Sequence, residues 1–303
     1  MTSGGPGQEG SIPGPSFEEA NEIAARHGLR RVGTRPSLLA YTKELWRFRH
    51  LTWTMAKGEF RARHQDNYLG LVWAVLTPIL LGVAYYLIFG VLIGIRGDLE
   101  NFVSFLTIGL FTFIFLSSVL TGGSKALLGK MGLVRSLNFP RVMLPIVVVI
   151  AEVLANLPAF LILVLIALLS GEQPGWTWLL FPVALFIVSM MGLGMAMLSA
   201  RLVHDVRDMI NLFPLMVRLL RYVSGVFFSI EVSLGRFSNV PAWIEIPLLY
   251  QPVAVALRMV REPLMGEYDL MWRTWAVGSG WALLFVVAGY LFFWRAEGTY
   301  GRG

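Results

Sequence analysis

The sequence predicts an all-α integral membrane protein with six transmembrane helices, an N-terminal amphipathic interfacial helix, and a short extracytoplasmic re-entrant helical hairpin before the last span. Composition is the first reason, because 56% of the 303 residues are hydrophobic and only 15% are charged, whereas soluble domains carry about 25% charged residues. The second reason is that the apolar residues form several runs about as long as the 20 residues that cross a bilayer as a helix. The chain contains 0 cysteines, which excludes disulfides, thiolate metal sites and cysteine nucleophiles.

The N-terminal part of the chain divides into two segments before the first amphipathic pattern. Residues 1–16 are mostly glycine, proline, serine and other polar residues. They cannot bury enough apolar area to offset the entropy cost of ordering, so we expect a disordered tail. Residues 17–37 are expected to form a cytoplasmic helix and linker, because acidic side chains begin the helix and arginines end it.

Residues 38–64 are expected to form an amphipathic helix in the lipid headgroup layer. Apolar side chains, beginning with Leu38, Tyr41 and Leu45, recur at helical spacing, and most basic residues lie off that stripe. Tryptophan and basic side chains just before a membrane span are typical of interfacial helices. The candidate interface residues are Trp46, Arg47, Trp53 and Lys57. The alternative, a soluble helix packed on a partner protein, stays open.

Residues 65–296 are predicted to form the transmembrane domain. Its six spans are expected at about 69–93, 102–121, 142–169, 177–200, 210–230 and 274–294. Between the last two spans, two apolar stretches separated by Pro252 are each too short to cross the bilayer. They predict the hairpin at about 236–262. Residues 297–303 are expected to be a cytoplasmic tail.

The distribution of lysine and arginine predicts the orientation. With the N-terminus inside, the inner segments carry eighteen of these residues, whereas the outer segments carry five arginines and eight acids. Basic residues accumulate on the cytoplasmic side of membrane proteins, so both termini are expected in the cytoplasm. The same distribution explains the net charge of +6, and nucleic-acid binding is therefore not expected.

No catalytic, metal or cofactor site is predicted in this chain. The nearest match to the phosphate-binding pattern GxxxxGK[ST], at residues 122–131, lacks the first glycine and the final Ser or Thr. The segment GGSKA at 122–126 also lacks the closing glycine of a nucleophile elbow. The four histidines, at positions 27, 50, 64 and 204, have no metal-binding spacing.

Charged residues inside the predicted spans are candidates for substrate contact, because such charges are costly in a bilayer. Glu152 in span three has two interpretations, a proton relay or the partner of an arginine from span five, and we favour the second. Arg218 and Arg221 lie on one face of span five. Their surplus positive charge would suit an anionic substrate.

Aromatic residues are dense in spans one, two and five. Most are expected to face lipid or the core, but some would stack on sugar rings if a pore lies between spans one and five. The candidate channel residues are Trp73, Tyr85, Tyr86, Phe89, Phe111, Phe227, Phe228, Arg218 and Arg221.

Four segments together resemble one transporter family. They are GEFRARHQDNYLGLVWAVLTPILLGVAYYLIFG (58–90), NFPRVMLPIVVVIAEVL (138–154), VHDVRDMINLFPLMVRLLRYVSGVFFS (203–229) and LLYQPVAVALRMVREPLMG (248–266). They are similar to the entrance of span one, the loop before span three, the second cytoplasmic loop with span five, and the last hairpin in membrane subunits of ABC-2 type polysaccharide exporters. This is the O-antigen and teichoic-acid export family. The resemblance covers about residues 41–296, and galactan exporters of actinobacteria look most similar.

The resemblance implies a homodimer of six-span subunits with a channel between the protomers, driven by two copies of a separate ABC ATPase that binds ATP and Mg. In such permeases short cytoplasmic helices dock on the ATPase. The corresponding candidates for ATPase coupling are Leu133, Arg135, Phe139, Arg141, His204, Asp205, Arg207 and Asp208. The N-terminal 40 residues have no counterpart in the family, so a regulatory or partner-binding role for them stays open.

The expected function is that of the membrane subunit of an ATP-driven exporter, which moves a lipid-linked polysaccharide across a bacterial inner membrane to the cell exterior without catalysing bond chemistry itself. Three alternatives stay open. The first is an ABC-2 exporter of a small molecule or drug. The second is an integral membrane glycosyltransferase or acyltransferase, and the third is a proton-coupled carrier that relies on Glu152.

Overall fold

The computed structural model describes residues 37–65, 72–92, 101–136, 139–235 and 241–297, together with Glu19, Glu22 and Gly94. The predicted tail at 1–16, almost all of the helix and linker at 17–37, and nearly all of the tail at 297–303 lie outside the described residues. Every regular element in the described ranges is a helix. The protein is therefore an all-α integral membrane protein.

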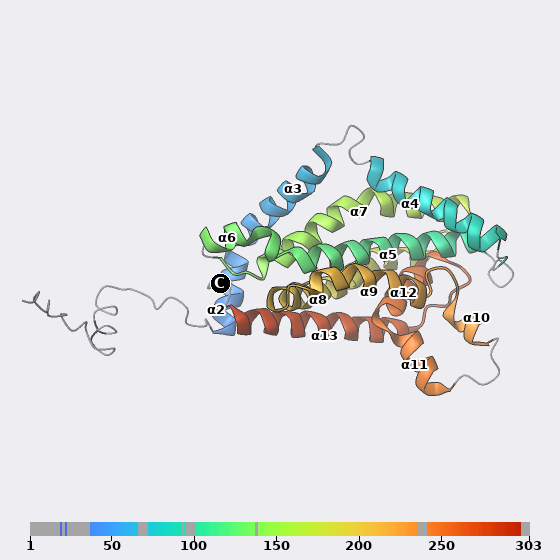
Figure 1. Cartoon of the computed structure of the whole chain (residues 1–303). Helices are drawn as coiled ribbons and strands as arrows, with labels where there is room; N and C mark the ends of the chain where they lie inside the picture. Colours follow the sequence, from blue (N-terminus) through green and yellow to red (C-terminus); the bar gives the residue numbers. More distant parts are fainter. Residues whose placement is uncertain are drawn as a thin grey trace, which may run out of the picture.

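Four long helices form the centre of the molecule. They are α5 (Phe102–Lys125), α7 (Met143–Leu169), α8 (Phe181–Asp205) and α13 (Trp272–Ala296). They run side by side along one axis, and α4 (Val72–Tyr85) crosses above them and continues as a π-helix at Tyr86–Leu92 (Figure 1). Two core clusters of buried apolar side chains hold these helices together.

Five described segments are long and apolar enough to cross a membrane. They are Val75–Leu92, Phe102–Lys125, Met143–Leu169, Trp176–Asp205 and Trp272–Ala296. A sixth candidate is the pair α11 (Ala242–Tyr250) and α12 (Pro252–Leu264), whose axes are bent by 60° at the break before Pro252. No residue of α11 is buried, whereas α12 is buried along nearly its whole length. The second half of the predicted hairpin thus re-enters the helix bundle.

The span predicted at 210–230 is shorter than expected. The helix there, α9 (Met209–Val223), has 15 residues, or about 22 Å at 1.5 Å per residue. It stops because Gly225 adopts a left-handed conformation with φ of 71°, the usual way in which a glycine just past the last turn ends a helix. After a short turn the chain forms α10 (Ile230–Gly235).

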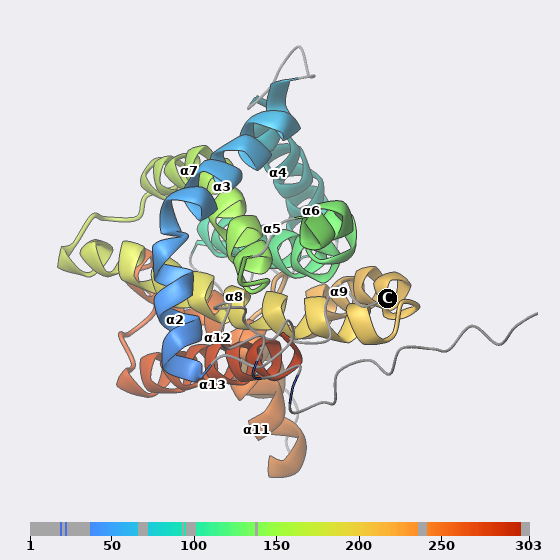
Figure 2. The same ribbon diagram turned by 90° about the vertical axis from the view of Figure 1, so that its left-hand side faces the viewer.

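The interfacial helix predicted at 38–64 is two helices instead of one. Helix α2 (Leu38–Arg47) is strongly amphipathic, the chain bends at Phe48, and α3 (Arg49–Gln65) follows. In the end-on view α2 crosses the end of the bundle (Figure 2), and its Tyr41 is buried there among core residues. Helix α3 then runs along α7. Both helices pack on the bundle, while Trp46 and Trp53 stay exposed.

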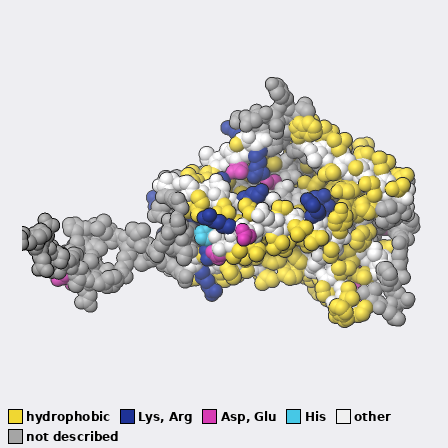
Figure 3. All heavy atoms as spheres, viewed as in Figure 1, with side chains coloured by type: hydrophobic (Ala, Val, Ile, Leu, Met, Phe, Trp, Pro, Cys, Tyr) yellow, Lys and Arg dark blue, Asp and Glu magenta, His cyan; other side chains and the backbone are white. Residues whose placement is uncertain are grey.

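The two ends of the bundle differ in character. Helices α2, α3 and α6 (Met131–Ser136) and the last turn of α13 lie at one end, and α10 and α11 lie at the other (Figure 1). Charged side chains gather near the first end, whereas hydrophobic side chains cover most of the remaining visible face (Figure 3). We refer to these as the basic end and the hairpin end.

Candidate transport pathway and coupling surface

An aromatic–arginine cluster joins the first apolar helix to α9 and the turn that follows it. We define the cluster as Tyr85, Phe89, Arg221, Tyr222 and Phe227. The ring of Phe227 stacks on Phe89 at 4.7 Å between centroids and lies 4.6 Å from Tyr85 and 5.7 Å from Tyr222. The π-helical turn after Tyr85 and the left-handed Gly225 are both local irregularities of the backbone. π-Helical turns often occur at functional sites.

Arg221 places a positive charge beside these rings. Its Nη1 donates a hydrogen bond to the Tyr85 hydroxyl at 3.3 Å, and its guanidinium carbon lies 5.3 Å from the centroid of Phe113. The buried Nε has no hydrogen-bond partner among the described residues. Arg218, one turn earlier, is exposed among exposed apolar residues such as Leu215 and Leu219. An exposed arginine on an apolar helix needs water, a ligand or another protein, because lipid cannot solvate it.

The structure brings together four of the nine predicted channel residues, Tyr85, Phe89, Phe227 and Arg221. The other five lie elsewhere. Phe111 is buried in the main core, and Tyr86 lies 6.3 Å from Phe102. Trp73 is exposed near the start of α4, Arg218 is exposed on α9, and Phe228 is half-buried behind the turn.

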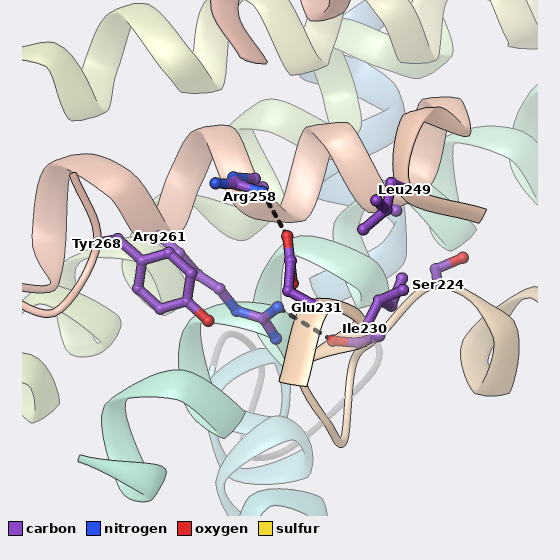
Figure 4. Close-up of a pocket in the computed structure, with 9 residues that line it drawn as sticks. Ser224, Ile230, Glu231, Leu249, Arg258, Arg261 and Tyr268 are labelled. Carbon is purple, nitrogen blue, oxygen red and sulfur yellow. Dashed lines mark hydrogen bonds and ion pairs between the residues drawn. The ribbon is translucent and has the colours of Figure 1, made fainter. Parts of the chain in front are cut away.

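The hairpin end contains a polar pocket that the sequence interpretation missed. Its lining includes Glu231, Arg258, Arg261 and Tyr268 (Figure 4). Arg258 forms an ion pair with Glu231 and donates to Glu262 at 3.1 Å. Arg258 and Arg261 lie at i, i+3 on α12 at the edge of an apolar stretch, and this spacing on one helix face is the signal by which they could have been found.

The first predicted coupling segment is partly internal. Phe139 is buried in the core at the basic end, and Leu133 packs against that core. Arg141 is held by Glu297, with its backbone N–H and Nη1 donating to Glu297 Oε1 at 3.3 and 2.8 Å. The side chain of Arg135 lies outside the described part of the chain. The contacts of Phe139 and Arg141 are therefore internal and hold this segment against the helix bundle.

Glu297 links three elements at the basic end of the bundle. Besides Arg141 from the start of α7, it binds Tyr41 of α2, whose hydroxyl donates to Oε2 at 2.9 Å. Burial raises the pKa of the Glu297 carboxyl above its ordinary value, although Arg141 opposes this shift. The end of α13, the start of α7 and the amphipathic helix α2 are therefore tied to one carboxylate.

The second predicted coupling segment is the more accessible one. Asp205, Arg207 and Asp208 are exposed in the connection between α8 and α9, and His204 is half-buried. Asp205 accepts from Arg201 at 3.0 Å and lies 3.2 Å from His204 Nδ1. This charged turn is therefore accessible to a partner protein at the basic end.

Glu152 pairs with a residue that the sequence interpretation did not name. The favoured prediction, an arginine of span five, is wrong, because the partner is Arg63 of α3. Arg63 also binds Glu59 at 3.2 Å, and Glu59 accepts from Lys130 Nζ at 2.6 Å. Helix α3 packs along α7, and this brings a basic residue of the N-terminal helix pair against the first half of the third span.

The pKa of Glu59 makes this ion-pair network sensitive to acid. Burial alone would raise the pKa of this carboxyl, but Lys130 and Arg63 outweigh burial and hold the pKa below its ordinary value. A carboxyl with a lowered pKa in the folded state stabilises the fold above its ordinary pKa of about 4.3, and this contribution is lost as pH falls through the folded-state pKa.

We therefore expect Glu59→Gln to be less stable than wild type at pH 7 by about 0.5–1 kcal/mol, the range for partly exposed ion pairs. The difference should shrink as pH falls below about 4.3. Unfolding midpoints of the two proteins in detergent, measured from pH 7 downward, test this. A difference that is constant across the whole range would contradict the ion-pair explanation.

Comparison with known proteins identifies the family. The family described as "ABC-2 type transporter" matches residues 50–250, which is well over half of the chain. The O-antigen export system permease protein RfbA of Myxococcus xanthus is 25% identical over 194 residues, covering 64% of this chain and 74% of the relative. A protein of the same name from Klebsiella pneumoniae is 23% identical over 208 residues, covering 68% and 77%. The matched region contains α4, α9 and both candidate coupling segments, and the chain belongs to the ABC-2 type transporter family.

Proposed function

We propose that this chain is the membrane subunit of an ATP-driven exporter that carries a lipid-linked polysaccharide from the cytoplasm to the cell exterior. The observation that carries this proposal is the pair of arginines on the largely apolar helix α9, with Arg221 beside the rings of Tyr85 and Phe113 and Arg218 exposed one turn earlier. Figure 3 shows a Lys or Arg group within the hydrophobic zone of this face. Charges in such a zone mark a water-filled pathway or a protein interface.

The chemistry of the cluster suits a glycan attached to a phosphate-bearing lipid. Aromatic faces pack against the CH faces of sugar rings, and arginine is the residue best adapted to bind phosphate. Among the described residues, the Nε of Arg221 has no hydrogen-bond partner. Both relatives described above are O-antigen export permeases, which supports a polysaccharide, including a galactan or a teichoic-acid polymer, as the cargo.

Energy comes, in this proposal, from a separate subunit. The sequence lacks a phosphate-binding loop, so ATP and Mg would bind to an ABC ATPase partner, and this chain would hold no cofactor or catalytic residue. Two permeases and two ATPases form the complex, with α4 and α9 lining the channel between the permeases. The exposed turn with Asp205, Arg207 and Asp208, together with the α6 segment, would contact the ATPase.

The location follows from this role. The chain would reside in the bacterial inner membrane with both termini in the cytoplasm, so that the basic end faces the ATPase. Trp46, Arg47, Trp53 and Lys57 would contact headgroups there. Lys57 lies 5.0 Å from the ring centroid of Trp53, a cation–aromatic pairing compatible with the headgroup layer. The hairpin would shape the outer exit.

Replacing Arg218 with leucine should reduce polysaccharide export by about tenfold, the effect of losing about 1.4 kcal/mol of interaction. The variant is expressed in a strain that lacks the native protein, and surface polymer and intracellular lipid-linked polymer are quantified together. We expect less polymer outside and more inside, while an ATPase still co-purifies with the variant.

The matched control is Arg273→Leu, because Arg273 is exposed at the start of α13 beside Trp272 and away from the cluster. It should export as wild type does. Normal surface polymer in the strain without the protein would contradict the proposed function. Wild-type export by Arg218→Leu would contradict the placement of the pathway along α9.

A further inference from the structure

Arg261 is a buried cation without a carboxylate partner among the described residues. Its side chain lies in α12 and is 5% exposed, and no described carboxylate lies within 4.0 Å of its nitrogens. Burying an unpaired charge is costly, and structural arginines at such depth are usually paired with an acid. The residue is also absent from the set of predicted channel residues, so its position calls for a separate explanation.

The guanidinium is satisfied by backbone carbonyls instead. Nε and Nη2 donate to the carbonyl oxygen of Phe105 at 3.3 and 3.2 Å, and the guanidinium carbon lies 3.5 Å from the centroid of the Phe105 ring. On its other side, Nη1 donates to the Gly225 carbonyl at 3.0 Å and Nη2 to the Val226 carbonyl at 3.2 Å. One planar side chain thereby connects α12, α5 and the turn after α9.

On the side of α5, Arg261 packs directly against Gly109. A side-chain carbon added to Gly109 of α5 would lie 3.2 Å from Arg261 Cζ and closer still to its Nη2. The same added carbon would lie 3.2 Å from the Val226 carbonyl oxygen. The absence of a side chain at Gly109 therefore permits the guanidinium to reach both carbonyls of the turn.

Two of the three carbonyls that Arg261 binds belong to the residues directly before Phe227. Gly225 needs a left-handed backbone, with φ of 71°, to make this turn, and the next residues carry Phe227 into its stack with Phe89 and Tyr85. Holding these carbonyls fixes the direction in which the chain leaves α9. It therefore fixes the place of the Phe227 ring as well.

We propose that Arg261 is a positioning residue that couples the hairpin at the outer end to the aromatic–arginine cluster of the transport pathway. A displacement of α12 would pull on the Gly225 and Val226 carbonyls and move Phe227 relative to Phe89. The role of Arg261 in transport rests on the proposed function. The link between α12 and Phe227 is a property of the protein by itself and is tested without transport.

The test follows the Phe227 ring by fluorine NMR of the full chain in detergent, with 4-fluorophenylalanine incorporated at position 227. The stacked ring of Phe89 shifts the resonance, and Phe89→Leu supplies the reference for a lost stack. We expect Arg261→Met to move the signal most of the way to that reference and to broaden it. Arg258→Met is the matched control, because Arg258 lies one turn earlier on α12 and binds Glu231 and Glu262, not the turn. It should leave the signal in place.

A second variant keeps the charge of Arg261 and tests the same link even if Arg261→Met does not fold. Gly109→Ala retains Arg261 but pushes its guanidinium away from the Val226 carbonyl, so it should shift the signal in the same direction. An unchanged signal in folded Arg261→Met or in Gly109→Ala would overturn the proposal, as would an equal shift in Arg258→Met. Export is measured separately in cells, so a failure of the proposed function leaves the spectroscopic result intact.

Discussion

Replacing Arg63 with methionine should lower the free energy of unfolding by about 1–3 kcal/mol, because it leaves the buried carboxylate of Glu152 without its charged hydrogen-bond partner. The remaining charge is Glu152, whose side chain is only 7% exposed in α7. The change also removes one of the two cations that bind Glu59. Helix α3 should then detach from α7 before the bundle unfolds.

A double-mutant comparison separates the ion pair from general damage. Arg63→Met combined with Glu152→Gln removes both charges and should recover most of the lost stability, whereas independent effects would add. Arg61→Met, on an exposed position of the same helix, should change stability by less than about 0.5 kcal/mol. Chemical unfolding in detergent is measured for wild type, Arg63→Met, Glu152→Gln, the double variant and Arg61→Met. Additive losses in the double variant would rule out the pairing of Arg63 with Glu152.

Gly194→Ala should destabilise the protein by about 1–3 kcal/mol, the usual cost of forcing an extra group into a packed interior. Gly194 of α8 faces α13 so closely that an added Cβ would lie 2.5 Å from Phe285 Cβ and nearer still to the backbone of Phe285 and Val286. Because backbone atoms cannot swing aside, the two helices must separate. Small residues at such contacts are what allow membrane helices to pack tightly.

Gly280→Ala is the matched control on α13. An added Cβ there meets nothing within 4 Å, and alanine has the better helix propensity by up to about 1 kcal/mol. This variant should therefore be neutral or slightly more stable. Unfolding midpoints and the monodispersity of the purified variants are the measurements. Equal stability of the two variants would show that α8 and α13 are not in close contact.

Hydropathy predicted most of the fold because it acts locally. A run of apolar residues forms a helix in a bilayer whatever surrounds it, since its backbone groups can be satisfied only internally. The long helices α5, α7, α8 and α13 follow directly from such runs. The hairpin was predicted for the same reason, because Pro252 divides a stretch whose halves are each too short to cross.

Local patterns failed where the backbone is irregular or where distant segments meet. The amphipathic stripe after Leu38 did not reveal the bend at Phe48 between α2 and α3. The apolar run through residue 230 did not reveal that Gly225 ends α9 early. Glycine accepts both helical and left-handed backbones, so its conformation at one position depends on what the rest of the chain requires.

By itself, the sequence determined that this is a multi-pass helical membrane protein, that it lacks a phosphate-binding loop, and which residues could carry charge or aromatic surface into the membrane. Tertiary structure alone decided the partners. Arg63 meets Glu152, Arg141 meets Glu297, and Arg261 meets the carbonyls before Phe227. The physical reason is that hydropathy is a sum over neighbouring residues, whereas the pairing of a buried charge depends on which helices pack side by side.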